Sequence, residues 1–186
     1  VDWWSFNDKG IYADFLGEWL YADQYKVNAK LTPYAGIVYD LTDVYSLYAS
    51  YTSIFTPDAL KDVNRAFLDP TEGHSYEAGV KAAYFGGALS LTAAVFMIQQ
   101  KNFHEYAGDD PITGDAYYRS IDGVTSKGFE IELSGRLAPG LQVYAGYTYT
   151  HARADDGSRV YSYILTTAPE HVVKLFATYR LPDQWS

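Results

Sequence analysis

GFEIELSGRLAPGLQVYAGYTYT, residues Gly128 to Thr150, is the stretch that decides the fold of this chain. A short turn at Pro139 and Gly140 divides it, and on both sides of the turn apolar side chains alternate with polar or small ones. The apolar positions are Phe129, Ile131, Leu133, Leu141, Val143, Ala145, Tyr147 and Tyr149. Such alternation around a Pro-Gly turn predicts a β-hairpin. One apolar and one polar face per strand are typical of a soluble sheet over a core, or of a membrane barrel with lipid outside and water inside.

The composition narrows the class of protein. Of 186 residues, 17% are aromatic, and 19 of these are tyrosines, whose rings suit a surface with one apolar and one wet end. The absence of cysteine excludes a disulfide framework and a thiolate metal site, and it is compatible with passage through an oxidising periplasm. A net charge of −9 argues against nucleic acid as a partner. No run of about 18 apolar residues occurs, which excludes transmembrane helices but not membrane strands.

The alternation extends over most of the chain. Residues 1–30 are aromatic and acidic without a sustained period, and we expect the end of a strand over residues 1–6, followed by a long exposed loop. The sequence starts at Val1, so we expect a processed chain or a fragment. Beyond Thr32 the pattern predicts about seven strands, over residues 35–41, 44–55, 75–84, 88–102, 117–136, 141–153 and 170–181.

The connections between these strands alternate between short and long. Short turns are expected at 41–43, 85–87 and 137–140, and long loops at 56–73, 103–116 and 154–168. This order places all short turns at one end of the sheet, as in outer-membrane barrels, whereas Greek-key sandwiches have no reason to produce it. Ten residues at about 3.3 Å each, tilted by about 40°, rise roughly 25 Å, which matches the apolar band of such a barrel.

The tyrosines follow the same geometry. Outward tyrosines mark both ends of the strands: Tyr39, Tyr45, Tyr84 and Tyr179 at the short turns, and Tyr51, Tyr76, Tyr147 and Tyr149 near the long loops. Two such bands are expected of aromatic girdles, although tyrosine is also simply a good strand residue. The predicted fold class is all-β: an antiparallel, up-and-down transmembrane β-barrel segment. Its inward residues are mostly small, which would leave a narrow barrel poorly packed and suits a wide one.

Several blocks of sequence, in order, resemble one known family. They are residues 32–41 (TPYAGIVYDL), 45–52 (YSLYASYT), 68–70 (LDP), 76–81 (YEAGVK), 125–135 (TSKGFEIELSG), 144–149 (YAGYTY), 169–171 (PEH) and 175–181 (LFATYRL). Together they resemble the barrel of TonB-dependent ferric-siderophore receptors, nearest to the hydroxamate and pyoverdine types. The resemblance implies a barrel of about 22 strands filled by an N-terminal plug. Residues 1–186 would then be one barrel segment of about seven or eight strands, lacking the plug, the TonB box and the final strands.

The resemblance also implies a function and its partners. The chain would be a multi-pass part of a receptor in the outer membrane of a Gram-negative bacterium. That receptor would import ferric siderophores with energy from TonB, transmitted through the plug domain. Its partners would be the ferric siderophore, the plug, TonB and outer-membrane lipid. Iron would be present only as the ferric-siderophore complex, with no cofactor bound directly, and no enzyme motif stands out.

Two groups of candidate site residues follow. At the long-loop end, aromatic rings, tyrosine hydroxyls and cations would hold a ferric siderophore, although each of these residues is individually more typical of loop packing or a girdle. They are Trp3, Trp4, Trp19, Tyr106, Tyr117, Tyr118, Arg119, Tyr161 and Tyr163, with Tyr117 to Arg119 at the mouth of a strand as the best cluster. The second group would face the lumen, where its members would either contact the plug or simply belong to a solvated wall. They are Glu77, Lys81, Glu130, Glu132, Lys174 and Arg180.

The remaining alternatives are weaker. His74 with Glu77 and His104 with Glu105 lack a third ligand at metal-site spacing, so no metal site is predicted. The chain could also be a complete small outer-membrane barrel of about eight strands with a structural or adhesive role, or a soluble tyrosine-rich sheet that binds carbohydrate. A piece of seven strands has two open edges that lipid cannot satisfy, so we expect it to be unstable alone in a bilayer.

Overall fold

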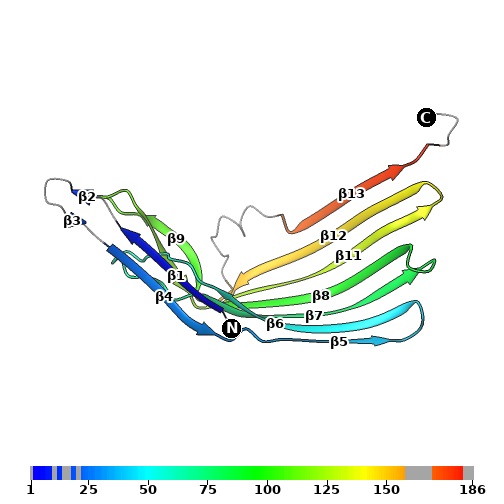
Figure 1. Ribbon diagram of the computed structural model, residues 1–186, viewed down its shortest axis with the longest axis horizontal. Coiled ribbons are helices and arrows are strands. Elements are labelled where there is room, and N and C mark those ends of the chain that lie inside the picture. The colour runs from blue at the N-terminus through cyan, green and yellow to red at the C-terminus, as the bar shows by residue number, and fades with distance from the viewer. Residues whose placement is uncertain (1, 10–11, 14–17, 20–21, 158–168, 182–186) are drawn as a thin grey trace.

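The computed structural model describes residues 2–9, 12–13, 18–19, 22–157 and 169–181, and for residues up to 24 and for 27–29 only the backbone is described. Seven described strands form one antiparallel sheet in the order β13-β12-β11-β8-β7-β6-β5 (Figure 1). Their bounds are β5 Tyr34–Asp40, β6 Tyr45–Thr56, β7 Thr71–Tyr84, β8 Leu89–Lys101, β11 Val124–Ala138, β12 Leu141–Ala154 and β13 His171–Tyr179. The predicted all-β antiparallel meander is therefore confirmed. Among the described residues, no helix is long and apolar enough to cross a membrane.

The connections lie as the sequence predicts. In Figure 1 the short turns β5–β6, β7–β8 and β11–β12 lie together at the right, and the long connections leave from the opposite end of the sheet. The β11–β12 turn closes with Gly140 at a φ of +78°, a left-handed conformation that glycine adopts without steric cost. In the β5–β6 turn, the Thr42 hydroxyl accepts hydrogen bonds from the backbone N–H groups of Val44 and Tyr45, at 3.1 and 3.0 Å.

The register separates the two faces of the sheet. One row of directly paired residues crosses all seven strands on the apolar face: Tyr39, Leu47, Val80, Ala93, Ile131, Tyr147 and Val173. The next row lies on the opposite face: Asp40, Ser46, Lys81, Thr92, Glu132, Gly146 and Lys174. We call the face that carries the first row the apolar face and the face that carries the second row the polar face. Adjacent residues of a strand point to opposite sides, so one register fixes every side chain's face.

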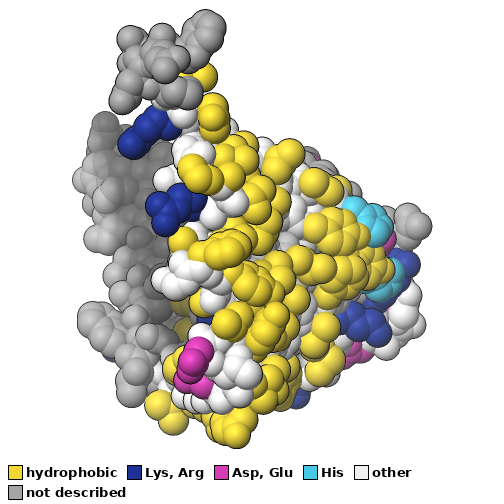
Figure 2. Space-filling model, turned by 90° about the vertical axis from the view of Figure 1, so that its right-hand side faces the viewer, with side chains coloured by type: hydrophobic (Ala, Val, Ile, Leu, Met, Phe, Trp, Pro, Cys, Tyr) yellow, Lys and Arg dark blue, Asp and Glu magenta, His cyan; other side chains and the backbone are white. Residues whose placement is uncertain are grey.

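The apolar face has no layer packed on it. Leu175 and Val173 are 77% and 75% exposed, and only four hydrophobic residues of the described part are buried. Figure 2 shows hydrophobic side chains spread over much of the described surface seen from the short-turn side. A sheet that leaves its apolar face bare needs lipid or a partner to cover it.

The sheet is also open at both edges. β5 and β13 stand at its ends and pair with each other nowhere in the described part of the chain. Unpaired edge N–H and C=O groups cannot be satisfied by lipid. The described sheet is therefore a segment of a barrel wall and not a closed barrel.

Three details of the prediction are wrong. In place of a loop over residues 7–30, β1 (Asp2–Lys9) pairs with β4 (Ala22–Lys30), and β2 (Tyr12–Ala13) pairs with β3 (Glu18–Trp19). The predicted loop 103–116 contains β9 (Phe103–Asp109), which pairs with β10 (Ala116–Ile121). The predicted strand 117–136 is broken into β10 and β11.

These corrections share a physical reason. The three added two-stranded sheets are separate from the seven-stranded sheet and project beyond its long-connection end in Figure 1. Strands outside the wall need no continuous apolar face, so their sequence lacks the alternation that marks the wall. The break before β11 falls at Asp122 and Gly123. A Cβ at Gly123 would collide with the Asp155 carboxylate, so a larger residue there would have to displace that side chain.

Candidate functional site

The β9–β10 hairpin carries four of the predicted siderophore residues, with the paired Tyr106 and Tyr118 on one face and Arg119, paired with Glu105, on the other. Tyr106, Tyr117, Tyr118 and Arg119 all lie on it, so the cluster at residues 117–119 belongs to this hairpin and not to the mouth of a wall strand. Tyr118 is paired with Tyr106, and their rings pack edge to face with centroids 6.2 Å apart and an interplanar angle of 81°. Edge-to-face pairs are a favourable aromatic geometry, so the two rings support each other.

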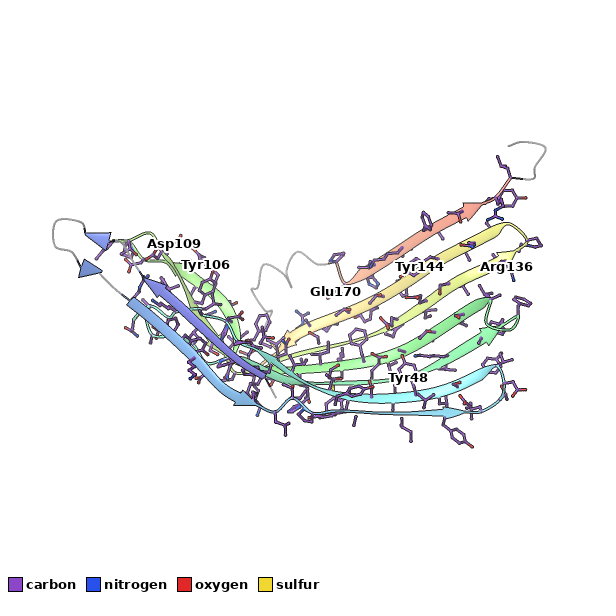
Figure 3. The ribbon with its side chains drawn as sticks, viewed as in Figure 1. Tyr48, Tyr106, Asp109, Arg136, Tyr144 and Glu170 are labelled. Atoms are coloured by element: carbon purple, nitrogen blue, oxygen red, sulfur yellow. The ribbon has the colours of Figure 1, made fainter. Side chains whose placement is uncertain are left out.

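Tyr106 lies near the tip of this hairpin together with Asp109, and Figure 3 labels both residues there. Its hydroxyl hydrogen-bonds to the Asp109 carboxylate, and this bond, followed by desolvation, raises the pKa of Tyr106 above 10.0. The phenol therefore keeps its proton at neutral pH. Tyr106 is 53% exposed, so an aromatic edge with a protonated hydroxyl faces solvent.

Arg119 is held in place by a residue that sequence reasoning missed. Its Nε and Nη2 atoms lie 2.8 and 2.7 Å from Oε2 of Glu105, the residue paired with it across the hairpin. The Glu105 side chain is 3% exposed and that of Arg119 is 65% exposed. A buried carboxylate needs such a partner. This pair can be identified only from the strand register. The register in turn can be assigned only once residues 103–121 are known to form a hairpin.

The loop over residues 57–70 docks against the hairpin. The backbone N–H of Tyr118 donates to the Lys61 carbonyl at 2.8 Å, and Arg65 Nη1 lies 2.8 Å from Asp115 Oδ2. Hydrogen bonds from Thr113 and Arg65 lower the pKa of Asp115 below 3.8. The side chains at this junction are half exposed, so the contact is a solvated one.

The same loop also contacts β4. The ring of Tyr25 stacks on Phe67, with centroids 5.0 Å apart, and its hydroxyl donates to the Leu68 carbonyl at 3.3 Å. Burial is the main cause that raises the pKa of Tyr25. Lys30 pairs with Glu72 at 2.5 Å. Three segments distant in sequence therefore form one assembly at the long-loop end.

The histidines considered as metal ligands have other contacts. His74 Nδ1 lies 2.8 Å from the Tyr51 hydroxyl, and His104 Nε2 lies 2.8 Å from the Asp69 carbonyl. The Nδ1 atom of His104 is buried without a hydrogen bond, 3.6 Å from Asp58 Oδ2. No group of three or more metal-ligating side chains occurs in the part of the chain that the structure describes.

The polar face carries a second group of predicted residues. The Tyr48 hydroxyl donates to Glu77 Oε1 at 2.5 Å, and Lys81 Nζ lies 4.7 Å from the centroid of the Tyr48 ring. Glu132 is paired in the register with Thr92 and Gly146, in the same row as Lys81 and Lys174. The middle of this face therefore holds charges of both signs with tyrosine donors between them.

Two cavities lie on the polar face between β11, β12 and β13. One, of about 220 Å³, is lined by Glu130, Glu132, Tyr144, Gly146, Thr148 and Lys174, and in it Tyr144 donates to Glu132 at 3.3 Å. The other, of about 590 Å³ at the short-turn end, is lined by Arg136, Gly140, Gln142, Thr178, Tyr179 and Arg180. Sequence reasoning named Arg180 but missed Arg136. The alternation in the sequence could have identified Arg136, because Arg136 is an even number of positions from Glu130 and Glu132 and therefore points to the same face of the strand.

The structure does not test every candidate. Trp3 and Trp4 lie on β1 and Trp19 lies on β3, where only the backbone is described. Tyr161 and Tyr163 lie outside the described residues. Their proposed contacts with a ligand stay predictions.

Comparison with known proteins gives consistent matches. A family model described as "TonB dependent receptor-like, beta-barrel" matches residues 1–186. The ferric-pyoverdine 358 receptor of Pseudomonas putida is 40% identical over 157 residues, which cover 83% of this chain and 19% of that protein. The ferrioxamine B receptor of Salmonella typhimurium is 37% identical over 120 residues, which cover 64% of this chain and 16% of that protein.

Solved structures agree with this result. The ferripyoverdine receptor of Pseudomonas aeruginosa, in complex with ferripyoverdine, superposes with a TM-score of 0.71 at 37% identity, covering 86% of this chain and 22% of that one. The alcaligin outer-membrane receptor of Bordetella pertussis gives a TM-score of 0.69 at 33% identity, covering 89% of this chain and 29% of that one. The chain therefore spans about a sixth to three tenths of the receptors it matches.

Proposed function

Because this chain belongs to the TonB-dependent receptor-like β-barrel family, we propose that it is part of the wall of a receptor that imports ferric siderophores. Relatives and structural neighbours are ferric-siderophore receptors of the outer membrane, a class that is not enzymatic. An outer-membrane location also accounts for the bare apolar face, which lipid would cover. The alternatives of a complete small barrel and a soluble carbohydrate-binding sheet are not favoured.

The observation that carries the proposal is the layout of the two ends of the sheet. The short turns lie at one end, and an assembly of long connections lies at the other (Figure 1), with Tyr106 exposed and Tyr117 and Tyr118 half-buried. Figure 3 shows Tyr106 and Asp109 far from Arg136, which lies at the short-turn end. In an outer-membrane barrel the long loops are extracellular, so the tyrosines meet a ligand that arrives from outside.

Tyr106, Tyr117, Tyr118 and Arg119 form the described part of the proposed siderophore site. Tyrosine rings and hydroxyls suit a bulky chelate with carbonyl and hydroxamate oxygens, and the exposed guanidinium of Arg119, whose charge Glu105 offsets, adds N–H donors. Trp3, Trp4, Trp19, Tyr161 and Tyr163 are the further candidates in the flanking loops. The cargo is a ferric siderophore of the hydroxamate or pyoverdine class, which brings its own iron.

The polar face is the proposed inner wall. Glu77, Lys81, Glu130, Glu132, Lys174 and Arg180 would face the lumen and the plug domain, and TonB would supply energy through that plug. Such charges are inexpensive on a face that is wet or that meets complementary charges. The mixed charges in the middle of this face support that assignment.

Binding of iron-loaded pyoverdine and ferrioxamine B to the full-length receptor tests the proposal. We expect Tyr106→Ala with Tyr118→Ala to weaken binding of the preferred chelate by about tenfold, as for aromatic residues central to an interface. Tyr39→Ala, at the short-turn end of the apolar face, is the matched control and should leave affinity unchanged. If neither chelate binds, or if the paired substitution has no effect on binding, the proposed site is wrong.

A further inference from the structure

The ring of His104, on β9, faces the loop over residues 57–70 with both of its nitrogens. The side chain is buried, with 5% of its surface exposed. Nε2 lies 2.8 Å from the Asp69 carbonyl oxygen. Nδ1 makes no hydrogen bond among the described residues and lies 3.6 Å from Asp58 Oδ2. The two ends of the loop therefore meet at one imidazole.

The Asp69 carbonyl fixes the tautomer of the neutral ring. A carbonyl oxygen only accepts hydrogen bonds, so Nε2 must carry the proton that it donates. Nδ1 of the neutral ring is then an acceptor, and it faces the Asp58 carboxylate, which also has only lone pairs to offer. Two acceptors in contact at a buried atom oppose each other. A proton on Nδ1, or a donor in place of the carboxylate, would turn this contact into a hydrogen bond.

Two carboxylates act on the surroundings of this ring. Burial is the main cause that raises the pKa of Tyr25, on β4, and the negative charges of Asp69 and Asp58 raise it further. A positive charge on His104 would offset both carboxylates. The other charged or titratable side chains on the surrounding elements have partners of their own: Lys30 with Glu72, Arg119 with Glu105, Arg65 with Asp115, Tyr106 with Asp109, and Lys61 over the Phe67 ring.

The two ends of the loop are held to β9 in different ways. At the end next to β7, the Asn102 side-chain amide donates to the Pro70 carbonyl at 3.3 Å, and the Thr71 hydroxyl donates to the Asn102 carbonyl at 2.9 Å. These groups do not titrate, so this end is held at any pH. The start of the loop meets β9 where Asp58 faces His104, and one proton decides whether that contact attracts or repels.

We propose that Nδ1 of His104 is a proton-binding site that, when occupied, fastens the start of the loop to the β9–β10 hairpin. The proton comes from solvent, forms an N–H bond at Nδ1 and is donated to the Asp58 carboxylate as a charge-assisted hydrogen bond. Histidine side chains change charge between about pH 5 and 8, so the contact responds to pH in that range.

The site lies beside the proposed ligand platform. His104 is paired with Ser120 and shares its face of the hairpin with the paired Tyr106 and Tyr118. Proton binding therefore ties the loop to the element that presents these two rings. This consequence rests on the proposed function, because only in a receptor of the outer membrane does this hairpin meet the pH outside the cell.

Hydrogen exchange of the full-length receptor, without siderophore, tests this. The Leu68 amide donates to the Leu60 carbonyl at 2.9 Å, close to Asp58 in the chain, so it reports on the start of the loop. After correction for the pH dependence of exchange itself, we expect this amide to exchange about three- to tenfold more slowly at about pH 5.5 than at about pH 8. The ion pair of Arg65 with Asp115 should stay closed over this range, because the pKa of Asp115 lies below 3.8.

Two substitutions at the contact should act in opposite directions. His104→Gln can still donate to the Asp69 carbonyl but takes up no proton, so Leu68 should exchange at the fast rate at both pH values. Asp58→Asn replaces the carboxylate by an amide, whose N–H can donate to Nδ1 of the neutral ring. In that variant Leu68 should exchange slowly even at the higher pH. A general effect of acid on the receptor would not produce this opposition.

His74→Gln is the matched control. It removes a histidine whose Nδ1 lies 2.8 Å from the Tyr51 hydroxyl, away from the loop contact, and it should leave the pH dependence at Leu68 unchanged. The inference is overturned if the unaltered receptor exchanges equally at both pH values, if His104→Gln keeps the difference, or if Asp58→Asn exchanges fast at the higher pH. No siderophore is present in these measurements, so uptake of iron-loaded siderophore by the unaltered receptor tests the proposed function separately.

Discussion

Arg65 Nη1 lies 2.8 Å from Asp115 Oδ2, and this ion pair joins two loops whose residues are 50 positions apart in the chain. The adjacent hydrogen bond from the Tyr118 N–H to the Lys61 carbonyl joins the same two segments through the backbone. The loop after β6 therefore supports the hairpin that carries Tyr106, Tyr118 and Arg119. Their position depends on contacts outside the membrane and not on the barrel wall alone.

Removal of the charge on Asp115 should loosen this junction. Asp115→Asn weakens the ion pair with Arg65, and because solvent-exposed pairs contribute little, we expect hydrogen exchange at the Tyr118 amide to rise by only about two- to fivefold. The measurement is hydrogen exchange of the full-length receptor, read at the peptide containing residue 118. Asp43→Asn, in the β5–β6 turn, is the control. Unchanged exchange in the Asp115 variant would mean that the backbone bond alone holds the loop.

The junction should open in acid. The pKa of Asp115 is lowered in the folded protein, so its contribution to stability is present above the usual value of 3.8 and is lost as the pH falls through the folded pKa. Spin labels at Val63→Cys and Ile112→Cys, which are 62% and 92% exposed, should give a distance distribution that broadens only below pH 3.8. In the Asp115→Asn background this pH dependence should vanish. Broadening at neutral pH would contradict the prediction.

The two faces of β13 should respond differently to charge. Val173 lies on the apolar face, and its neighbour Val172 lines the polar cavity with Glu130 and Glu132. Val173→Arg places a cation toward lipid near the middle of the wall, so we expect a loss of about 2–4 kcal/mol in the free energy of folding into vesicles. Val172→Arg meets carboxylates and should cost much less. Equal costs for the two neighbouring valines would show that the faces are assigned wrongly.

Gly79 should not tolerate a methyl group. A Cβ there would lie 2.5 Å from the Ala93 carbonyl oxygen and 2.7 Å from Cε1 of Tyr48, whose ring covers the glycine. We expect Gly79→Ala to lower the free energy of unfolding by about 1–3 kcal/mol, the usual cost of overpacking. Gly146→Ala is a matched control on the same face, because its Cβ would meet no atom closer than 3.5 Å. Urea titration of receptor folded in vesicles measures both.

The local alternation of the sequence determined the wall. Residues 128–150 form β11, the turn at Gly140 and β12 with the predicted parity, and the same reading located all seven wall strands and the short–long order of their connections. The strands could be located in this way because alternation with a period of two indicates which side of a strand meets lipid. The alternation is a local property of each strand and does not depend on its neighbours. The predicted polar-face residues follow from the same parity.

The tertiary structure decided which residues become neighbours. β11 pairs with β8 although the β9–β10 hairpin separates these two strands in the sequence. The strand that was predicted to begin at Tyr117 is interrupted at Gly123. The pairs Arg119 with Glu105 and Arg65 with Asp115, and the shared cavity of Arg136 and Arg180, each join separate segments. Alternation assigns a side chain to a face but carries no information on the register or on the strand beside it. Those depend on hydrogen bonds between distant parts of the chain, which form only when the sheet is assembled.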